Sequence, residues 1–362
     1  MKIAISLPYF PGYGTGTGNA VRNLAKGLIS AGCNIDVLTE KKFSKINYQD
    51  DLKKNIKILN TKRSYPYRLD KKNYSKNLSN YDLVILNGNF VLFNFFLSRL
   101  LIKKKIPYIF FPHTDYSQHQ MKKNYFLKKV YFWLFEKTVI HKSLSTILFS
   151  HKQKIPFFKI LGKKKNTIII PNSINLSKFR NIKKKKNYKK ITRLLFLGRR
   201  DIYIKGIDIL IEALNKKENS NYFEIIFYGK DIGHDKKIIS LLEKSNIKYK
   251  INKHIDGELF ELYKKYDCLI LPSRADSFSM TVLECIAHGF PVAISTSVGI
   301  SQHISKGNCG ILFAPTVKGI NSALKKMKFM SVNQIKNRSN KGVIYSKKNL
   351  EFTIVGKKLY KD

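Results

Sequence analysis

Acidic residues, cysteines and long apolar runs are all scarce in this chain of 362 residues. None of the four cysteines forms a C-x-x-C pair, so neither a zinc site nor a disulfide framework is supported, and a reducing compartment is favoured. The longest candidate membrane segment, "FVLFNFFLSRLLI", has 13 residues and includes Asn, Ser and Arg. The opening "KIAISLPYF" is too short for a signal peptide. These absences predict a soluble, cytoplasmic protein.

Positive charge is abundant, with 68 Lys+Arg against 24 Asp+Glu and a net charge of +44. Three interpretations stay open at this point: codon bias, attraction to an anionic membrane surface, and nucleic-acid binding. Arginine is scarce beside lysine, and no RNP-like, zinc-finger or heptad pattern is present. Nucleic acid is therefore the least favoured partner.

Strand-like and helix-like segments alternate along the chain in two series, and 43% hydrophobic content is typical of a globular protein. The pattern predicts an α/β protein with two Rossmann-like, doubly wound domains and a cleft between them. We expect an N-terminal Rossmann-like domain at 1–182, a basic linker at 183–190, a C-terminal Rossmann-like domain at 191–340, and a helical tail at 341–362 that returns to the first domain.

Ligands of such sheets bind beyond the carboxyl ends of the strands, so the residues that follow the predicted strands are the candidates for a functional site. The first predicted strand, "KIAISL", is followed by "GYGTGTGNA", whose glycines allow backbone amides to approach a phosphate. A dinucleotide fingerprint is excluded, because its third glycine would fall on Asn19 or Thr17. Gly16 and Gly18 remain candidates for ligand binding, and a plain surface loop is the alternative.

Two cations and a histidine also follow predicted strands. Arg199 and Lys205 in "LFLGRRDIYIKG" suit a diphosphate, although solvated loop charges explain them equally well in so basic a chain. His113 closes "YIFFPHTD", and a lone histidine is more often structural than functional. Its place at a strand end favours a functional role.

The stretch "PSRADSFSMTVLECIAHGFP" predicts a loop and then a short helix that ends at Gly289. The helix begins near Ser279, Met280 and Thr281, whose amides are candidates to receive a phosphate or a hydroxyl. Glu284 is placed to accept hydrogen bonds from a ribose, and Asp276 from a sugar hydroxyl. A glycosidase also needs two carboxylates but has no use for a phosphate clamp. The combination predicts a nucleotide-sugar site.

These motifs, in this order, resemble the retaining GT-B glycosyltransferases of family 4, including their bacterial surface-polysaccharide branch, over about residues 1–320. The resemblance rests on the glycine-rich loop, His113, "PNSIN", "GRRDIYIKG", and the acidic-x7-acidic pair followed by A-x-G-x-P. The chain departs from the family pattern in having Asp276 for Glu, serines at 277 and 279 for glycine, and Gln302 for Glu. These departures bear on which donor sugar is used.

The resemblance implies transfer of a sugar from a UDP- or GDP-sugar to a hydroxyl of a lipid-linked or polysaccharide acceptor, with retention of configuration. It assigns the acceptor side to the domain at 1–182 and nucleotide-sugar binding to the domain at 191–340, with Gly16 and Gly18 as donor-binding residues. It assigns diphosphate stabilisation to Arg199 and Lys205, ribose binding to Glu284, a donor-sugar contact to Asp276, and a contact with the sugar or the acceptor to His113. No cofactor and no metal are expected, because no metal-ligand cluster ends a predicted strand. The alternatives are a nucleotide-sugar epimerase of the same fold and a non-catalytic protein that binds anionic polymers.

Two stretches interleave aromatic residues with lysines, at 90–105 and 124–137. Each is either a helix packed on the sheet with solvated lysines or a surface that inserts into a membrane interface. Tyr125, Phe126, Tyr131, Phe132, Trp133 and Phe135 exceed what one buried stripe needs, and Trp beside Lys is typical of membrane interfaces. We therefore predict peripheral attachment to the anionic inner face of the cell membrane.

Overall fold

The computed structural model describes residues 1–7, 16–40, 56–59, 61–62, 68–69, 78–114, 116–122, 124–176, 189–252 and 259–361. It divides into two compact units, unit 1 (Met1–Ser173 with Glu351–Asp362) and unit 2 (Ile174–Leu350). The predicted boundary at 340/341 falls inside one helix, α15 (Val332–Asn349), which belongs wholly to unit 2. Most of the predicted linker 183–190 lies outside the described residues.

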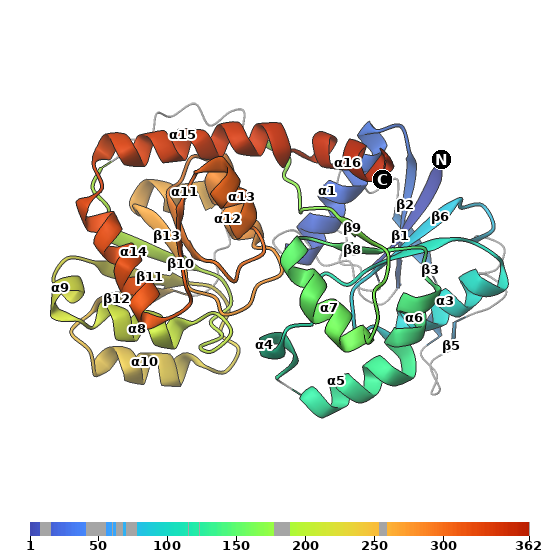
Figure 1. The fold of residues 1–362 in the computed structure, drawn as a ribbon, viewed down its shortest axis with the longest axis horizontal. Coiled ribbons are helices and arrows are strands. Elements are labelled where there is room, and N and C mark those ends of the chain that lie inside the picture. Colours follow the sequence, from blue (N-terminus) through green and yellow to red (C-terminus); the bar gives the residue numbers. More distant parts are fainter. Residues whose placement is uncertain are drawn as a thin grey trace. The chain divides into compact units, whose positions relative to one another are not determined.

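Unit 1 contains a parallel sheet in the order β3-β2-β1-β6-β7-β8-β9 (Figure 1). Its strands are β1 (Lys2–Ser6), β2 (Asn34–Glu40), β3 (Ile56–Leu59), β6 (Leu83–Asn87), β7 (Tyr108–Phe111), β8 (Thr146–Leu148) and β9 (Thr167–Ile169), with β4 (Thr61–Lys62) and β5 (Arg68–Leu69) forming a separate antiparallel pair. Its helices are α1 (Gly16–Ser30), α3 (Leu92–Lys103), α4 (Gln118–Met121), α5 (Tyr125–Tyr131), the π-helix η3 (Phe132–Glu136), α6 (Lys137–Lys142), the 3-10 helix η4 (His151–Gln153), α7 (Lys154–Leu161) and α16 (Phe352–Lys361).

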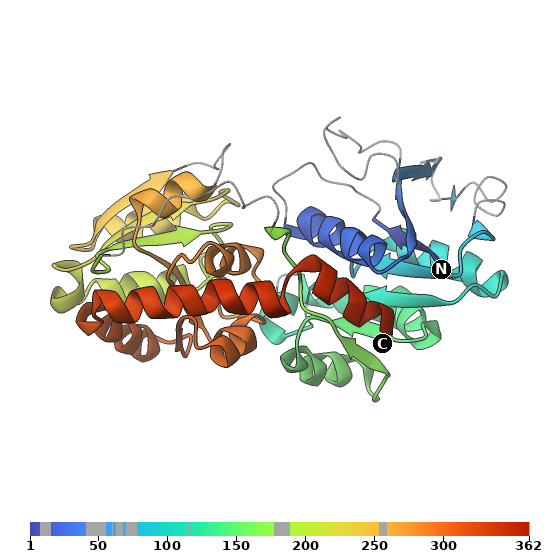
Figure 2. The ribbon, with the colours of Figure 1, turned by 90° about the horizontal axis from the view of Figure 1, so that it is seen from above.

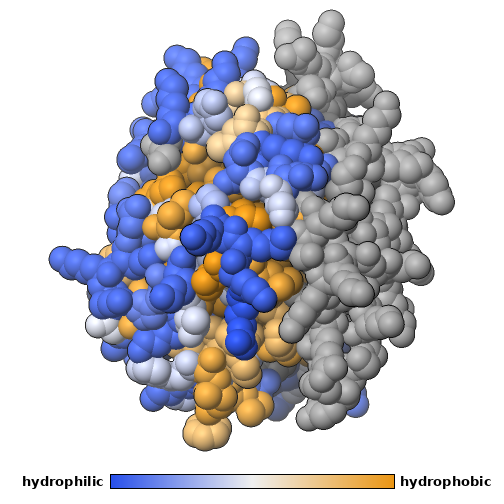
Figure 3. Space-filling view, turned by 90° about the vertical axis from the view of Figure 1, so that its right-hand side faces the viewer, coloured by the Kyte–Doolittle hydropathy of each residue, from blue (hydrophilic) through white to orange (hydrophobic). Residues whose placement is uncertain are grey.

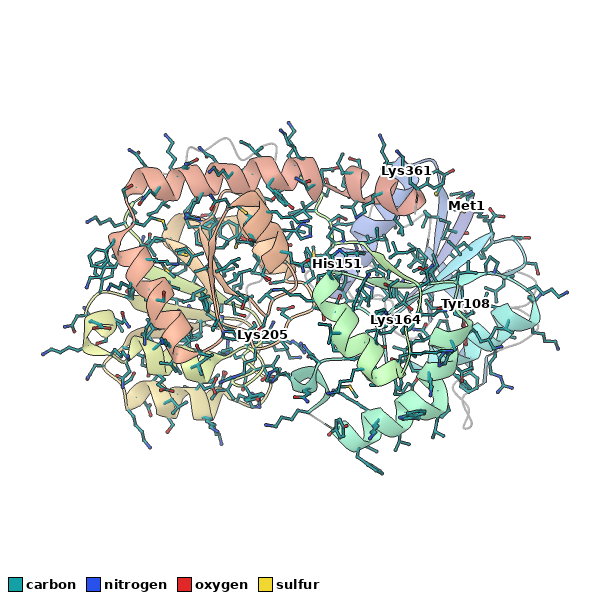
Figure 4. All side chains as sticks on the ribbon, viewed as in Figure 1. Met1, Tyr108, His151, Lys164, Lys205 and Lys361 are labelled. Atoms are coloured by element: carbon teal, nitrogen blue, oxygen red, sulfur yellow. The ribbon has the colours of Figure 1, made fainter. Side chains whose placement is uncertain are left out.

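The core of unit 1 follows the alternation of the strands. Side chains of one parity, among them Val84, Leu86 and Phe110, pack against α3, η3, α6 and α7. Tyr108 belongs to the same layer and is labelled in Figure 4; its hydroxyl donates to the Val139 carbonyl of α6 at 2.8 Å. Strands covered on both faces explain why these segments read as continuous apolar runs.

The C-terminal helix α16 returns to unit 1 and packs on α1, as both views show (Figures 1 and 2). The crossing is close because two glycines meet: a Cβ on Gly356 would lie 2.1 Å from the carbonyl carbon of Gly27. Any larger side chain at this point would force the two helices apart.

Unit 2 contains a parallel sheet in the order β12-β11-β10-β13-β14-β15. Its strands are β10 (Arg193–Leu197), β11 (Glu224–Tyr228), β12 (Lys248–Asn252), β13 (Cys268–Leu271), β14 (Val292–Ser295) and β15 (Ile311–Phe313). Its helices are α8 (Ile207–Leu214), α9 (Lys217–Ser220), α10 (Asp235–Glu243), α11 (Leu259–Lys265), α12 (Met280–Ala287), α13 (Ser301–Gly307), α14 (Val317–Phe329) and α15. Helices cover both faces of this sheet (Figure 1).

Both sheets are doubly wound, so the predicted fold class is confirmed. In each sheet, the strand order reverses between two neighbouring strands, β1 and β6 in unit 1 and β10 and β13 in unit 2. The space outside the carboxyl ends of such a pair is where ligands of open α/β sheets bind. Within the described residues, none of the helices is long and apolar enough to cross a membrane.

Candidate functional site

The best-formed site lies in unit 2, at the carboxyl ends of β10 and β13. A glycine brings the two loops that follow these strands together. Gly206 has a φ of +67°, and a Cβ there would lie 2.2 Å from the Pro272 carbonyl oxygen. Only glycine accepts both the left-handed conformation and the close approach. The "KG" of the sequence motif therefore lets the loop after β10 sit directly on the loop after β13.

Arg274 ties the same two loops together. Its amide donates to the Ile204 carbonyl at 2.9 Å, and its guanidinium makes two parallel hydrogen bonds to Asp208 at 2.7 and 2.8 Å. The guanidinium also lies over the Tyr203 ring, 4.6 Å from its centroid. Such a bidentate pair adds geometric rigidity as well as energy. The sequence analysis did not identify this residue, although it lies two positions before Asp276.

This arrangement brings Lys205 to Asp276, with 2.5 Å between Nζ and Oδ2 (Lys205 is labelled in Figure 4). Only about one seventh of either side chain is exposed, at 14% and 15%. The Asp276 backbone is held in turn, since its carbonyl accepts from the Gly299 amide at 2.8 Å. The structure thus joins two predicted site residues and holds an ammonium group at the reversal of the sheet.

The two adjacent arginines after β10 have different roles. Arg200 is buried, pairs with Asp235 at 2.5 and 2.6 Å, and donates to the carbonyls of Gly229 and Asn252. Arg199 is exposed, and its side chain forms no hydrogen bond or ion pair with any residue that the structure describes. A buried, fully paired arginine has a structural role, whereas Arg199 remains available to a ligand.

Helix α12 presents its amino end at the same place. Ser279 is the N-cap, and its hydroxyl accepts from the Val282 amide at 3.4 Å. The amides of Met280 and Thr281 have no acceptor within the described part of the chain. Free amides in the first turn and the helix dipole together favour an anion here. The predicted C-terminal end of this helix is also confirmed, with Gly289 in a left-handed conformation at φ +68°.

Glu284 lies one turn into α12. Its side chain is half-buried and forms no hydrogen bond within the described residues. Burial raises the pKa of this carboxyl to about 7, because the charged form loses water without gaining a donor. A polar group in this condition is costly unless a ligand supplies the missing donors. Two hydroxyls on adjacent carbons, as in a ribose, match the two oxygens of the carboxylate.

In unit 1, His113 follows β7 in a left-handed conformation with a φ of 55°. The Thr114 amide donates to the Pro112 carbonyl at 2.6 Å and so closes a tight turn around it. Its ring stacks on Phe111, with 4.2 Å between centroids, and its Nε2 lies 2.7 Å from Oδ1 of Asn87. Burial lowers the pKa of His113 to about 4, so the ring is neutral at physiological pH.

The glycine-rich segment is partly outside the described residues, which include neither Gly12 nor Gly14. Gly16 and Gly18 were expected in a loop, and the structure places both in the first turn of α1, with Gly18 buried. This is a correction of their local structure. Helix formation prevails here because buried apolar residues recur at helical spacing from Ala20 to Leu28, and a helix start tolerates glycine.

A second residue that the sequence analysis did not identify is Glu136, at the end of the π-helix. Its carboxylate accepts from the Phe90 amide and from the Tyr116 hydroxyl, and so joins the loops after β6 and β7. Burial raises its pKa to about 7, partly offset by these two donors. A π-helix often marks a functional region, but single-sequence periodicity does not reveal one.

The two aromatic and lysine-rich stretches differ in the structure. The first forms α3, whose Phe93, Leu97 and Leu101 are buried in the core. The second forms α5 and η3 and leaves an apolar surface exposed, here called the α5 surface: Tyr125, Phe126, Leu127, Val130, Trp133 and Leu134. Of the six aromatic residues predicted to exceed a buried stripe, Tyr125, Phe126 and Trp133 are exposed, Tyr131 and Phe135 are half-buried, and Phe132 is fully buried in the core. Figure 3 shows hydrophobic atoms at the lower end of the molecule, at the height of α5 in Figure 1.

Comparisons with known proteins agree with this geometry. A model described as Glycosyltransferase Family 4 matches residues 14–178, and one described as Glycosyl transferases group 1 matches residues 191–327. A 41.2 kDa protein of the cps region of Klebsiella pneumoniae is 29% identical over 244 residues, which are 64% of this chain and 65% of that protein. Lipopolysaccharide glucosyltransferase WaaG of Escherichia coli (strain K12) is 29% identical over 164 residues, 43% of this chain and 41% of that protein.

Both alignments thus span less than two thirds of the relative's length. Among solved structures, HepE of Anabaena in complex with UDP and glucose superposes with a TM-score of 0.74 at 13% identity, over 100% of this chain and 98% of that one. At this identity the likeness concerns the fold. Because both halves of the chain match glycosyltransferase models and both sheets have the corresponding architecture, the chain is a glycosyltransferase of the GT-B type.

Proposed function

We propose that the protein transfers a sugar from a nucleoside-diphosphate donor, a UDP- or GDP-sugar, to a hydroxyl of a lipid-linked or polysaccharide acceptor, with retention of configuration. The observation that carries the proposal is the composition of the unit 2 site. Within one reversal of the sheet it combines an unpaired arginine, a held lysine, free helix amides and a carboxylate without a donor. These groups complement the phosphates and the ribose of one nucleotide.

In the proposed mechanism, Arg199 and Lys205 stabilise the negative charge that grows on the leaving diphosphate. Fixed positive groups act strongly in a site where water is excluded, and they need no reorganisation during the reaction. The amides of Met280 and Thr281 bind a phosphate oxygen, and Glu284 accepts the ribose hydroxyls. Asp276 accepts a hydroxyl of the donor sugar with the oxygen that Lys205 leaves free.

For unit 1 we assign His113 to the donor sugar or to the acceptor, with Gly16 and Gly18 of α1 near the donor. The acceptor proton leaves through the donor phosphate, and no metal or cofactor takes part. The surface-polysaccharide setting, which comprises O-antigen, capsule and lipopolysaccharide synthesis, is supported by the relatives named from a cps region and from lipopolysaccharide synthesis. The donor class is supported by the UDP and glucose bound to HepE.

The test is incubation of the full chain with a panel of UDP- and GDP-sugars, with and without lipid-linked acceptors, while nucleoside diphosphate release is measured. We expect release with at least one donor, and an NMR coupling in the product that shows the same anomeric configuration as in the donor. A new nucleotide sugar formed without acceptor would instead indicate the epimerase. If neither product forms and the protein binds to an anionic polymer, the result would indicate the non-catalytic binding protein.

We also propose that the α5 surface attaches the protein to the cytoplasmic face of an anionic membrane. Phe126 is 75% exposed and Trp133 53% exposed, an unusual position for large apolar side chains. Lys137 lies over the Trp133 ring, 3.6 Å from its centroid, and Lys129 lies near Tyr125. Aromatic side chains with lysine beside them are typical of a bilayer interface, where each lysine adds about 1 kcal/mol. Membrane attachment would bring the enzyme to lipid-linked acceptors.

Vesicle sedimentation tests this attachment. The protein is expected to sediment with phosphatidylserine vesicles at low salt and to be released at high salt. It should not sediment with phosphatidylcholine vesicles. Phe126→Ser with Trp133→Ser should lose most of the binding without loss of stability, because both side chains are exposed. Replacing the lysines of both stretches with Gln should also abolish it (Lys103, Lys104, Lys105, Lys128 and Lys129).

The matched control is Lys236→Gln with Lys237→Gln, two exposed lysines of α10 in unit 2. In helix α5, Lys128 already donates to the Gln120 carbonyl at 2.6 Å, so its contribution to membrane binding should be smaller than that of Lys129. Equal binding to neutral vesicles, or an equal loss of binding in the control variant, would contradict membrane attachment. Codon bias would then explain the net charge of +44.

A further inference from the structure

A set of buried, uncharged polar side chains lies at the carboxyl edge of the unit 1 sheet and has no part in the chemistry assigned above. Ser6 ends β1, Asn87 ends β6, and Asn94 lies in α3; at most 2% of any of them is exposed. They occupy the reversal between β1 and β6, the counterpart of the charged site in unit 2. Buried polar groups of this kind are retained only when they are hydrogen-bonded.

The direction of each hydrogen bond in this set is determined. Asn94 Nδ2 lies 2.7 Å from the Asn87 carbonyl and 2.8 Å from the Gly88 carbonyl, so it is the donor. Its Oδ1 therefore accepts the Ser6 hydroxyl at 3.0 Å, and Ser6 Oγ accepts the Asn87 amide at 3.2 Å. Both the amide and the carbonyl of Asn87 are thereby held in place.

The Asn87 side chain is oriented as well. Its Nδ2 faces the Ile85 carbonyl at 3.5 Å, which leaves Oδ1 for the imidazole of His113 at 2.7 Å. An amide oxygen only accepts, so Nε2 of His113 must carry the proton. A neutral ring protonated at Nε2 has its lone pair on Nδ1, and this atom has no partner within the described residues.

We infer that Asn87 is a positioning residue that fixes His113 as the Nε2-protonated tautomer, so that Nδ1 accepts a hydrogen bond from a substrate hydroxyl. His113 then acts neither as an acid nor as a cation in sugar transfer. The stacked Phe111 ring and the tight turn at His113 restrain the imidazole on its other sides. The substrate half of the inference rests on the proposed function; the tautomer does not.

Nitrogen-15 NMR of the imidazole rings in the full chain tests the tautomer directly. The chain has eight histidines, and a His113→Gln spectrum assigns the signal. At neutral pH we expect a protonated Nε2 and an unprotonated Nδ1. Asn87→Leu should give a mixture of tautomers and reduce turnover about 10-fold, the scale for removing the partner of a functional histidine.

Asn87→Asp keeps the shape and the acceptor but adds a charge. The charge favours the imidazolium, so the His113 pKa should rise by about 1 to 3 pH units, and activity should fall below that new value. Burial alone lowers the pKa in the unmodified protein, with no contribution from a charged neighbour. Asn89→Asp is the matched control, because Asn89 Oδ1 accepts from the Thr114 hydroxyl at 2.7 Å, whereas the His113 ring is hydrogen-bonded to Asn87.

An Nδ1-protonated ring in the unmodified protein would overturn the inference even if sugar transfer is normal. An unchanged tautomer and pKa in both Asn87 variants would overturn it too, and thermal unfolding of each variant shows that it is folded. The expected tautomer without turnover of any donor would overturn the proposed function, and the substrate hydroxyl with it, while leaving the role of Asn87 toward the ring in place.

Discussion

The two units hold polar groups at the same topological position in opposite ways. At the β10/β13 reversal, unit 2 uses ion pairs, Lys205 with Asp276 and Arg274 with Asp208. At the β1/β6 reversal, unit 1 uses neutral hydroxyl, amide and imidazole groups. The ion pairs hold cations at the place where we propose that a diphosphate binds, whereas the neutral network holds a hydrogen-bond acceptor. The difference matches a diphosphate in one unit and an uncharged hydroxyl in the other.

Among the described residues, each unit also has one carboxyl group whose pKa burial raises to about 7. Glu136 in unit 1 accepts from an amide and a hydroxyl, whereas Glu284 in unit 2 has no donor within the described residues. A satisfied carboxylate stabilises its surroundings, and an unsatisfied one at a strand end favours a ligand with donors. The same shift therefore has a structural meaning in one unit and a functional one in the other.

The largest effect is expected from the cations of unit 2. Arg199→Ala and Lys205→Ala should each lower turnover by about 100-fold or more, because each removes a preorganised charge from the leaving group. Lys205→Ala should be the more severe, since it also leaves Asp276 without its cation. Steady-state kinetics with a nucleotide sugar that the unmodified protein uses as donor measures the turnover of both variants.

Lys230→Ala provides the control, an exposed cation after the neighbouring strand β11. It should leave turnover nearly unchanged, because β11 does not border the reversal. Near-normal turnover in either site variant, or an equal loss in the control, would break the contrast between a charged unit 2 site and a neutral unit 1 site.

Unit 1 also differs from unit 2 in containing a helix, α16, that is distant in sequence from the rest of the unit. Gly356→Val should destabilise unit 1 by about 1–3 kcal/mol, the usual cost of overpacking, because the side chain would meet the Gly27 backbone. Urea unfolding of the full chain, followed with a probe in unit 1, measures the change. Lys357→Val introduces the same side chain at an exposed neighbouring position and should have little effect.

A smaller effect is expected from the pH dependence of donor binding. Because the pKa of Glu284 is raised to about 7, its carboxyl is protonated below that pH and ionised above it. The ionised form accepts ribose hydroxyls, so donor affinity should rise with pH through about 7 and then level off. Isothermal titration with a nucleotide sugar, whose diphosphate diester does not titrate here, measures this.

Glu284→Gln should flatten that profile and weaken binding about 10-fold at pH 8, because a neutral amide is a poorer acceptor. Glu136 titrates in the same range, so Glu136→Gln is the informative control. If the pH dependence disappears in the Glu136 variant and persists in the Glu284 variant, the assignment of the two carboxyls is reversed.

The smallest effect is expected from metal removal. Turnover should be unchanged in EDTA, since in the proposed mechanism Arg199 and Lys205 neutralise the diphosphate. Activity that EDTA abolishes and Mn²⁺ restores would contradict this assignment. Turnover of the Lys205→Ala variant that Mn²⁺ partly restores would show instead that the two kinds of cation are interchangeable at the site.

Much of the unit 2 site was predictable because its residues lie close together in the sequence. Asp276, Ser279 and Glu284 belong to one strand, loop and helix, so hydrophobic periodicity and the glycine at 289 suffice to place them. The two doubly wound sheets were likewise predictable from the alternation of segments. His113 was predictable as a strand-end residue, although its protonation was not, since that depends on Asn87, 26 positions earlier.

Other features depend on contacts between residues far apart in the chain. Sequence alone could not distinguish the paired Arg200 from the available Arg199, nor the core helix α3 from the exposed α5 surface. Glu136 binds Phe90 across 46 positions, and Gly27 meets Gly356 at the other end of the chain. Local composition and periodicity determined the fold class and the charged loop of unit 2, because each depends on neighbours in sequence. Tertiary structure decided which polar groups are satisfied and which remain for a ligand, because burial and hydrogen-bond partners come from packing.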